Sequence, residues 1–217
     1  MNINKKIALN LLKIGAVFLR PKEPFTWVSG IKSPIYCDNR IILSFPEVRT
    51  EVELALAQNI RDNFPDVEVI AGTATAGIPH AAIVAHLLNL PMVYVKTIQK
   101  SYGRKNTIEG KLTPNCKAVV LEDLISTGLS SIAVVNSLKN VEVNVLGVMS
   151  IFTYDLKISE ENFKKNNIIL KALCSYNALI ELALKNNNIN NEEFELLKMF
   201  QSDPTIFSES VNSELKL

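Results

Sequence analysis

Two adjacent carboxylates and a hydroxyl-rich turn stand close together in the segment Val119–Ser131. Glu122 and Asp123 follow an apolar run, and the turn Ser126–Ser130 comes directly before a helical pattern. A helix N-terminus with free backbone N–H groups binds phosphate, hydroxyl side chains add donors, and a glycine lets the backbone approach closely. Carboxylates suit a polyol or a metal ion. The segment therefore combines a place for a phosphate with a place for a sugar.

Each half of this segment also has a simpler explanation. Glu122 and Asp123 taken alone are a solvated pair that caps the following helix, and Ser126–Ser130 taken alone is an ordinary capped helix start. An apolar strand, two carboxylates and a hydroxyl-rich turn in this order indicate a particular function more specifically than either half alone, or than a lone glycine-rich motif. This combination indicates phosphoribose binding and does not name an acceptor.

Short apolar runs alternate with helical stretches from Glu68 to Met149, which is typical of a parallel sheet flanked by helices. In such sheets ligands bind beyond the carboxyl ends of the strands, where Glu122 falls. We predict strands at Glu68–Gly72, Met92–Lys96, Lys117–Glu122 and Asn144–Ile151, and helices at Pro46–Asn63, Ala76–Leu88 and Leu129–Leu138.

The flanking regions give weaker patterns. Ile7, Leu11 and Ile14 have helical spacing and predict an amphipathic first helix, whereas Phe25–Asn39 predicts irregular or short extended structure. The tail after Gln201 is predicted to be poorly ordered or only weakly docked. Toward the C-terminus we predict a strand at Ile168–Leu173 and helices at Tyr176–Leu184 and Glu192–Phe200.

Composition limits the classes of function. The 217 residues suit one domain, and a formal net charge of +1 gives no broad basic field for nucleic acid. No stretch reaches the roughly 20 apolar residues that span a bilayer, so no membrane association is expected. Cys37, Cys116 and Cys174 are odd in number and widely spaced. We interpret them as buried small residues of a cytoplasmic protein, with no disulfide framework or zinc site.

The segment Val119–Ser131 closely resembles the phosphoribosyl-diphosphate loop of the type I phosphoribosyltransferases. The resemblance implies an α/β fold with a parallel sheet flanked by helices and a small hood formed from the N- and C-terminal segments. It implies that the turn holds the 5′-phosphate of 5-phosphoribosyl 1-diphosphate (PRPP) and that the two carboxylates face the ribose hydroxyls. The residues implied to hold PRPP are Thr73, Thr75, Lys96, Lys100, Tyr102, Glu122, Asp123, Leu124, Ile125, Ser126, Thr127, Gly128, Leu129 and Ser130.

Further segments resemble orotate phosphoribosyltransferases in particular. The stretch Phe25–Arg40 matches the part of the hood that covers the base, which makes Ser29, Gly30 and Lys32, together with Ser126, the expected neighbours of orotate. The turn Ala71–His80 is expected to lie against the diphosphate. A bland tight turn is its simpler explanation, and we interpret His80 and His86 as structural.

The segment Val95–Gly110 resembles the catalytic loop that reaches across a homodimer and neutralises the diphosphate. Lys100 matches the loop lysine, Lys96 stands where the pattern usually has arginine, and Tyr102 stands where it usually has histidine. Tyrosine donates a hydrogen bond but carries no positive charge near neutral pH. Lys96, Lys100, Tyr102, Glu122 and Asp123 are the predicted catalytic residues.

The stretch Met149–Asp155 matches a variant without the arginine that meets the orotate carboxylate in other members. Backbone N–H groups around Ser29–Lys32 and the Ser126 hydroxyl are the candidates to replace it. Magnesium is the expected cofactor, held by substrate oxygens with at most an indirect contact from Asp123. We expect one domain over residues 1–217, with a core of about 46–155 and a hood of about 1–45 joined by parts of 156–217.

Two other functions remain open from the sequence. A phosphoribosyltransferase for a purine base would share the PRPP site, although Phe25–Arg40 argues against it. A non-catalytic PRPP-sensing regulator would explain Thr97 and Tyr102, but it would need a DNA-reading element and a basic face. The favoured function is transfer of phosphoribose to orotate in UMP biosynthesis.

Overall fold

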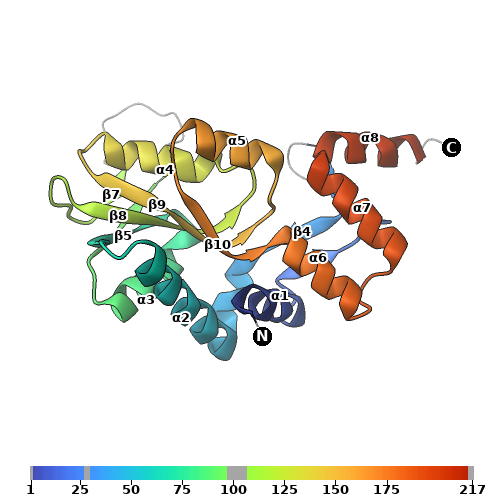
Figure 1. Ribbon diagram of the computed structural model, residues 1–217, viewed down its shortest axis with the longest axis horizontal. Coiled ribbons are helices and arrows are strands. Elements are labelled where there is room, and N and C mark those ends of the chain that lie inside the picture. Colours follow the sequence, from blue (N-terminus) through green and yellow to red (C-terminus); the bar gives the residue numbers. More distant parts are fainter. Residues whose placement is uncertain (1, 27–29, 97–106, 215–217) are drawn as a thin grey trace.

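A six-stranded sheet forms the centre of the molecule in the order β10-β9-β8-β5-β6-β7 (Figure 1). The computed structural model describes residues 2–26, 30–96 and 107–214. Neighbouring strands are parallel except for the β6–β7 pair, so the predicted parallel α/β sheet is confirmed. The strands are β5 Val69–Thr73, β6 Met92–Val95, β7 Ile108–Glu109, β8 Lys117–Ile125, β9 Asn144–Thr153 and β10 Leu170–Ser175.

Helices cover both faces of the sheet (Figure 1). Side chains alternate between the faces along each strand. In β8, Val119 and Leu121 join the larger hydrophobic cluster, while Ala118 and Val120 join the smaller one. The helices on the larger cluster's side are α1 Ile3–Lys13, α2 Pro46–Asn63 and α3 Gly77–Leu88, and those on the other side are α4 Leu129–Lys139 and α5 Lys157–Lys165.

The first helix is followed by a short strand. It ends at Lys13, Gly15 follows with a φ of +68°, and Val17–Leu19 forms strand β1. Glycine adopts this left-handed backbone conformation without steric cost, which lets the chain leave the helix. The predicted amphipathic first helix is confirmed, although Ile14, the last residue of the predicted spacing, stands just after its end.

Short antiparallel strands and a 3₁₀ helix make up the predicted irregular region. Strand β1 pairs with β4, Ile35–Cys37, and β2, Phe25–Thr26, pairs with β3, Lys32–Ser33. The 3₁₀ helix η1 spans Asn39–Ser44. These elements lead into α2 and lie beside the carboxyl end of β8, where Asn39 contacts Asp123.

The C-terminal region contains three helices, α6 Tyr176–Lys185, α7 Asn191–Ser202 and α8 Pro204–Glu214. The last one contradicts the prediction of a poorly ordered or weakly docked tail. Asp203 accepts hydrogen bonds from the backbone N–H groups of Thr205 and Ile206, at 2.8 and 3.1 Å, and so caps α8. Phe207 is fully buried, because its ring packs edge-on against Phe200.

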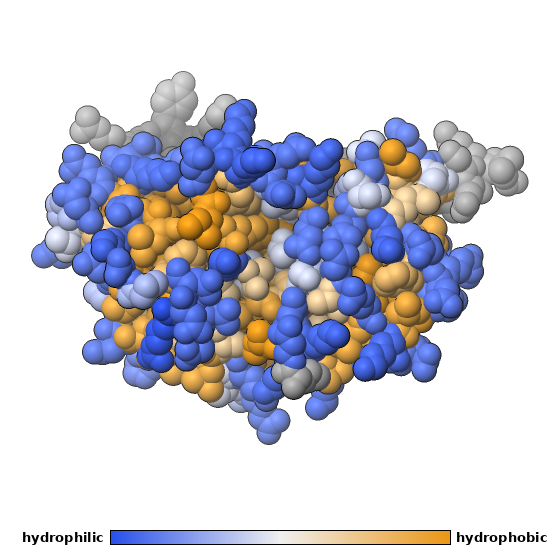
Figure 2. Space-filling view, in the orientation of Figure 1, coloured by the Kyte–Doolittle hydropathy of each residue, from blue (hydrophilic) through white to orange (hydrophobic). Residues whose placement is uncertain are grey.

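Hydrophilic residues cover the outer edge formed by α4 and α5, and hydrophobic residues gather on the surface below it (Figure 2). In the part of the chain that the structure describes, we find no helix with both the length and the apolar character to cross a membrane. All three cysteines are free; Cys37 and Cys174 are buried as predicted, whereas Cys116 is only half-buried.

Candidate active site

The two carboxylates lie inside strand β8, which continues to Ile125 and so passes the predicted end at Glu122. Pairing of β8 with β5 ends at Leu121, whereas pairing with β9 continues to Ile125 opposite Thr153. Glu122 and Asp123 therefore stand where β8 has lost one neighbouring strand. On that side the start of α3 and the Asn39 side chain take the place of a strand, at the carboxyl ends of the strands.

The turn after β8 is shaped for an anion. Gly128 has a φ of +79° and begins α4 without a side-chain cap. The first N–H groups of a helix have no intrahelical acceptor, so they are available to a phosphate. A Cβ atom at Gly128 would overlap the ring of Phe163 in α5, and the Asn162 side-chain amide donates to Thr127 O at 2.9 Å. Helix α5, which the sequence analysis missed, thus supports the turn from behind.

Side chains of the turn differ in exposure. Ser126 and Thr127 are half-buried, and Leu129 and Ser130 are exposed, so these residues face the site or the solvent. Ile125 is only 1% exposed and packs in the core, so its side chain is unavailable to a ligand. Leu124 is half-buried and contacts the larger hydrophobic cluster.

Glu122 is held within the protein rather than presented to solvent. The Ser131 hydroxyl donates to Glu122 Oε2 at 3.1 Å, and the Asp123 backbone N–H donates to Oε1 at 3.2 Å. The residue is 5% exposed. Burial, together with the charge of Asp123, raises the pKa of Glu122 to about 8. Burial and the neighbouring carboxylate therefore both favour the protonated form of Glu122.

Asp123 is the more accessible carboxylate and its backbone is fixed. Burial raises its pKa, while the hydrogen bond with Glu122 and the nearby charge of His80 lower it. The side-chain amide of Asn39 donates to Asp123 O at 2.7 Å. Asn39 is fully buried at the start of η1. The hood region and the core strand are thus joined at the residue expected to face the ribose.

A buried pair of ionisable residues lies under the site. His80 Nδ1 and Glu53 Oε1 are 2.5 Å apart, and both residues are 1% exposed. Burial raises the pKa of Glu53, and the hydrogen bond to His80 opposes that shift. Within the described residues His80 Nε2 and Glu53 Oε2 have no hydrogen-bond partner. His86, by contrast, is exposed on the same helix.

The turn between β5 and α3 lies directly beside the first turn. A Cβ atom at Gly77 would stand 2.6 Å from Leu121 O, so only glycine lets α3 press this closely on β8. Thr75 is exposed, whereas Thr73 is 2% exposed and its hydroxyl has no partner among the described residues. Helix α3 also lacks a side-chain cap, although in its first turn the Ile78 N–H donates to Thr75 O at 3.2 Å and Pro79 has no N–H. Two helix N-termini without side-chain caps therefore meet at one edge of the sheet.

The expected catalytic loop is described only at its two ends. Lys96 follows β6; its backbone N–H donates to Thr107 O at 2.7 Å, and its ammonium lies 2.6 Å from Glu109 Oε1. This exposed ion pair raises the pKa of Lys96. Lys96 is therefore charged but already paired. Thr97, Lys100 and Tyr102 lie outside the described residues.

The described part of the expected base site is the β2–β3 hairpin. The Lys32 ammonium donates to Thr26 Oγ1 at 2.9 Å, and the Lys32 backbone N–H donates to Ser208 Oγ at 3.0 Å. That backbone N–H is thus occupied and unavailable for the orotate carboxylate. Gly30 is exposed with a φ of +87° and open space around it, and Ser29 lies outside the described residues.

Comparison with known proteins agrees with this geometry. The family model described as the phosphoribosyl transferase domain matches residues 40–171. The orotate phosphoribosyltransferase of Listeria innocua is 51% identical over 207 residues, covering 95% of this chain and 99% of the relative. The chain belongs to the orotate phosphoribosyltransferase family.

Solved structures show the same fold. The orotate phosphoribosyltransferase from Aeropyrum pernix has a TM-score of 0.74 at 23% identity, covering 85% of this chain and 99% of that one. The UMP synthase of Leishmania donovani has a TM-score of 0.77 at 23% identity. The match covers 91% of this chain and 42% of that longer protein. The type I phosphoribosyltransferase fold predicted from the sequence is thus confirmed.

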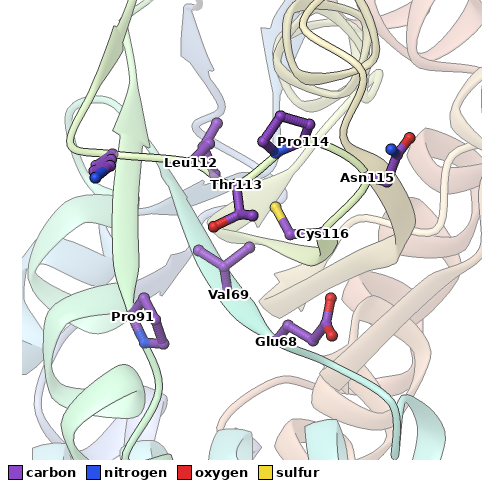
Figure 3. Close-up of a pocket in the computed structure, with 9 residues that line it drawn as sticks. Glu68, Val69, Pro91, Leu112, Thr113, Pro114, Asn115 and Cys116 are labelled. Atoms are coloured by element: carbon purple, nitrogen blue, oxygen red, sulfur yellow. The ribbon is translucent and has the colours of Figure 1, made fainter.

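A separate cavity of about 360 Å³ lies at the opposite end of the sheet (Figure 3). Glu68 precedes β5 and Val69 begins it, Pro91 precedes β6, and Cys116 precedes β8, so this cavity lies at the amino ends of the strands. Ligands of open parallel sheets bind at the carboxyl ends. The cavity is therefore distinct from the site that the orotate phosphoribosyltransferase family shares.

Sequence reasoning missed three contributors to the site. Asn39 and Ser208 act on the backbone of residues far away in the chain, and no local pattern announces such contacts. Glu53 stands on the apolar face of α2 opposite His80 on α3. A carboxylate on the apolar face of a helix predicts a buried polar partner, so this pair could have been found from the sequence.

Proposed function

We propose that this chain transfers the phosphoribosyl group of PRPP to orotate, giving orotidine 5′-monophosphate and diphosphate in pyrimidine biosynthesis. The observation that carries the proposal is the meeting of two uncapped helix N-termini, those of α3 and α4, beside Asp123 at the carboxyl ends of β5 and β8. Relatives at about half identity over nearly the whole chain support orotate as the acceptor.

In this proposal the phosphates of PRPP occupy the two turns. Ser126, Thr127, Gly128, Leu129 and Ser130 surround the 5′-phosphate with backbone N–H groups and hydroxyls. Thr75, exposed in the second turn, contacts the diphosphate, and the buried hydroxyl of Thr73 is a further donor. Lys96, Lys100 and Tyr102 complete the neutralisation of the diphosphate when the loop closes.

The two carboxylates have different parts in the proposal. Asp123 is the more accessible of the two, so it accepts hydrogen bonds from the ribose hydroxyls and stabilises the oxocarbenium-like ribose as diphosphate departs. Glu122, whose pKa is raised by burial, accepts hydrogen bonds from the Ser131 hydroxyl and the Asp123 backbone N–H, so it holds Asp123 in place. Catalysis then comes from positioning, electrostatics and exclusion of water, with no covalent intermediate on the protein.

The site fits a magnesium ion bound together with PRPP. Asp123 and the hydroxyls of Ser126 and Thr127 offer oxygen donors, which magnesium prefers, and substrate phosphates usually complete its shell. The ion would supply charge neutralisation at the diphosphate. Asp123 would contact it at most indirectly, through water.

Orotate is proposed to bind between the β2–β3 hairpin and the β8–α4 turn. Gly30 has an exposed backbone, and the Lys32 ammonium keeps donors beyond its bond to Thr26, because an ammonium has three. Ser126 and, outside the described residues, Ser29 complete the expected neighbours. The stretch Met149–Asp155 lacks the arginine of other members, and at 3% exposure the Tyr154 ring in this stretch packs in the core.

We also propose the cellular form of the enzyme. The chain acts as a single domain in a cytoplasmic homodimer with shared active sites, and neither nucleic acid nor membrane takes part.

An acceptor panel tests the choice of base. Purified enzyme with PRPP and magnesium is offered orotate, uracil, adenine, guanine or hypoxanthine in separate reactions, and release of diphosphate is measured. We expect release with orotate alone. Release with a purine and none with orotate would overturn the assignment while keeping the PRPP site.

A further inference from the structure

The hairpin proposed to bind orotate has little support of its own. Within residues 2–26 and 30–96, strands β2 and β3 pair at two positions, Phe25 opposite Ser33 and Thr26 opposite Lys32. The Phe25 ring contacts Tyr36 and the Arg20 guanidinium, but these contacts hold β2 and not the strand that carries Lys32. A two-stranded hairpin this short is not stable in water by itself. The ion pair between Lys22 and Glu192 of α7 is exposed at both ends, and such surface pairs contribute little. Another element must therefore fix the position of Lys32.

Helix α8 meets this requirement. The hydroxyl of Ser208 accepts the backbone N–H of Lys32 at 3.0 Å, across 176 residues of sequence. Ser208 is 8% exposed, so water competes poorly for this hydrogen bond. Helix α8 lies next to α7 at the end of the molecule away from α2 and α3 (Figure 1).

Helix α8 is itself anchored to the core through a continuous series of aromatic rings. Phe207 packs on Phe200, Phe200 on Tyr176, Tyr176 on Tyr154, and Tyr154 on Phe152 in β9, with centroid distances from 5.4 to 6.3 Å. The Tyr176 hydroxyl donates to Leu197 O at 3.0 Å. The position of Ser208 is therefore set by the same strand that pairs with β8.

We propose that α8 positions the orotate-binding hairpin, with the Ser208 hydroxyl fixing the backbone of Lys32 so that its ammonium and the neighbouring Gly30 face the base. This inference rests on the proposed function of that hairpin. Ser208 is a positioning residue, because it acts on orotate only through Lys32. Among the described residues its hydrogen bond goes to the hairpin and not to the PRPP-binding turns, so we expect its effect to be specific to the base.

The substitution Ser208→Ala removes the acceptor and leaves the Lys32 N–H unsatisfied. We expect the KM for orotate to rise about tenfold, which corresponds to the loss of one hydrogen bond. The KM for PRPP and the kcat should stay within about twofold of wild type. Ser208→Thr keeps the hydroxyl and should restore the orotate KM. Ser210→Ala is the matched control, since the Ser210 hydroxyl bonds to Phe207 O in its own helix.

A second measurement reads the contact directly and does not require turnover. Hydrogen exchange of the Lys32 amide should be faster in Ser208→Ala than in wild type, while exchange of the core amide of Val119 should be unchanged. Unchanged exchange at Lys32, an unchanged orotate KM, or an equal rise of both KM values would each overturn the inference. Absence of turnover in the wild-type enzyme would instead overturn the proposed function.

Discussion

At the scale of single residues, the proposed site depends on two neighbouring carboxylates, Glu122 and Asp123, that have different surroundings. Sequence reasoning gave Glu122 and Asp123 the same part, because both belong to one motif. The structure gives them different partners, although their side chains are also hydrogen-bonded to each other. Glu122 accepts a hydrogen bond from Ser131 of α4, whereas the charge of His80 acts on Asp123 and Asn39 holds the Asp123 backbone.

The first prediction concerns the stability of the free enzyme. Burial raises the folded-state pKa of Glu122 to about 8 from an ordinary 4.5, so the folded protein binds this proton more tightly than the unfolded chain. That contribution is fully present below the unfolded pKa and is lost as the pH rises through the folded pKa. The unfolding free energy of the wild-type protein should therefore fall between about pH 5 and pH 9. In Glu122→Gln this fall should be smaller than in the wild type by on the order of 2 kcal/mol.

Urea denaturation at several pH values measures this difference. Glu53, Asp123 and Asp155 also have raised pKa values, so the wild-type protein keeps part of its pH dependence in either case. Glu160→Gln, on the exposed side of α5, is the control. Parallel pH dependence in the wild type and in Glu122→Gln would show that Glu122 is not the buried acid described here.

At the scale of elements, the sequence predicted the repeated strands and helices well and the supports of the site poorly. The strands β5, β6, β8 and β9 and helices α2, α3 and α4 were found within one to three residues, because apolar periodicity and length determine them. Helix α5 was missed, because only Phe163 and Ser159 on it are buried. Helix α8 was missed although Asp203 and Pro204 form a recognisable cap and first turn.

The second prediction concerns the contact between α5 and the phosphate turn. Gly128→Ala must adopt a φ of +79° and displace the Phe163 ring, so it should destabilise the protein by about 2–4 kcal/mol. Gly15→Ala is the matched control, with a φ of +68° and only an ordinary contact at 3.5 Å to Phe18. It should cost about 1 kcal/mol. Urea denaturation compares the two, and equal losses would mean that the clash with Phe163 is unimportant.

At the scale of the whole molecule, the base site joins segments from both ends of the chain. The N-terminal hairpin rests on the C-terminal helix, and both connect to β8 and β9 through Asn39 and the aromatic series. Local pattern cannot reveal such contacts, because a hydrogen bond between Lys32 and Ser208 depends on the complete fold. The orotate assignment from sequence therefore came from resemblance, while the PRPP turn was also readable from its chemistry.

The third prediction concerns the homodimer with shared sites. If the loop of one subunit serves the site of the other, each active site takes Asp123 from one subunit and Lys100 from its partner. Lys100→Ala and Asp123→Asn then remove contributions that come from different subunits. Each variant alone should lose roughly 100-fold in kcat. Mixed dimers, prepared by co-expression with two affinity tags, should regain substantial activity, since one of their two sites has both native residues. Isolated mixed dimers no more active than either parent would contradict the sharing of sites.

The most direct test of the central claim follows orotate itself. The purified enzyme is mixed with orotate, PRPP and magnesium, the loss of orotate absorbance is recorded, and PRPP binding is measured in parallel by calorimetry. The account predicts tight PRPP binding and a loss of orotate matched by equal amounts of diphosphate and orotidine 5′-monophosphate. Tight binding of PRPP without any loss of orotate would contradict it, and would indicate a protein that senses PRPP rather than one that consumes it.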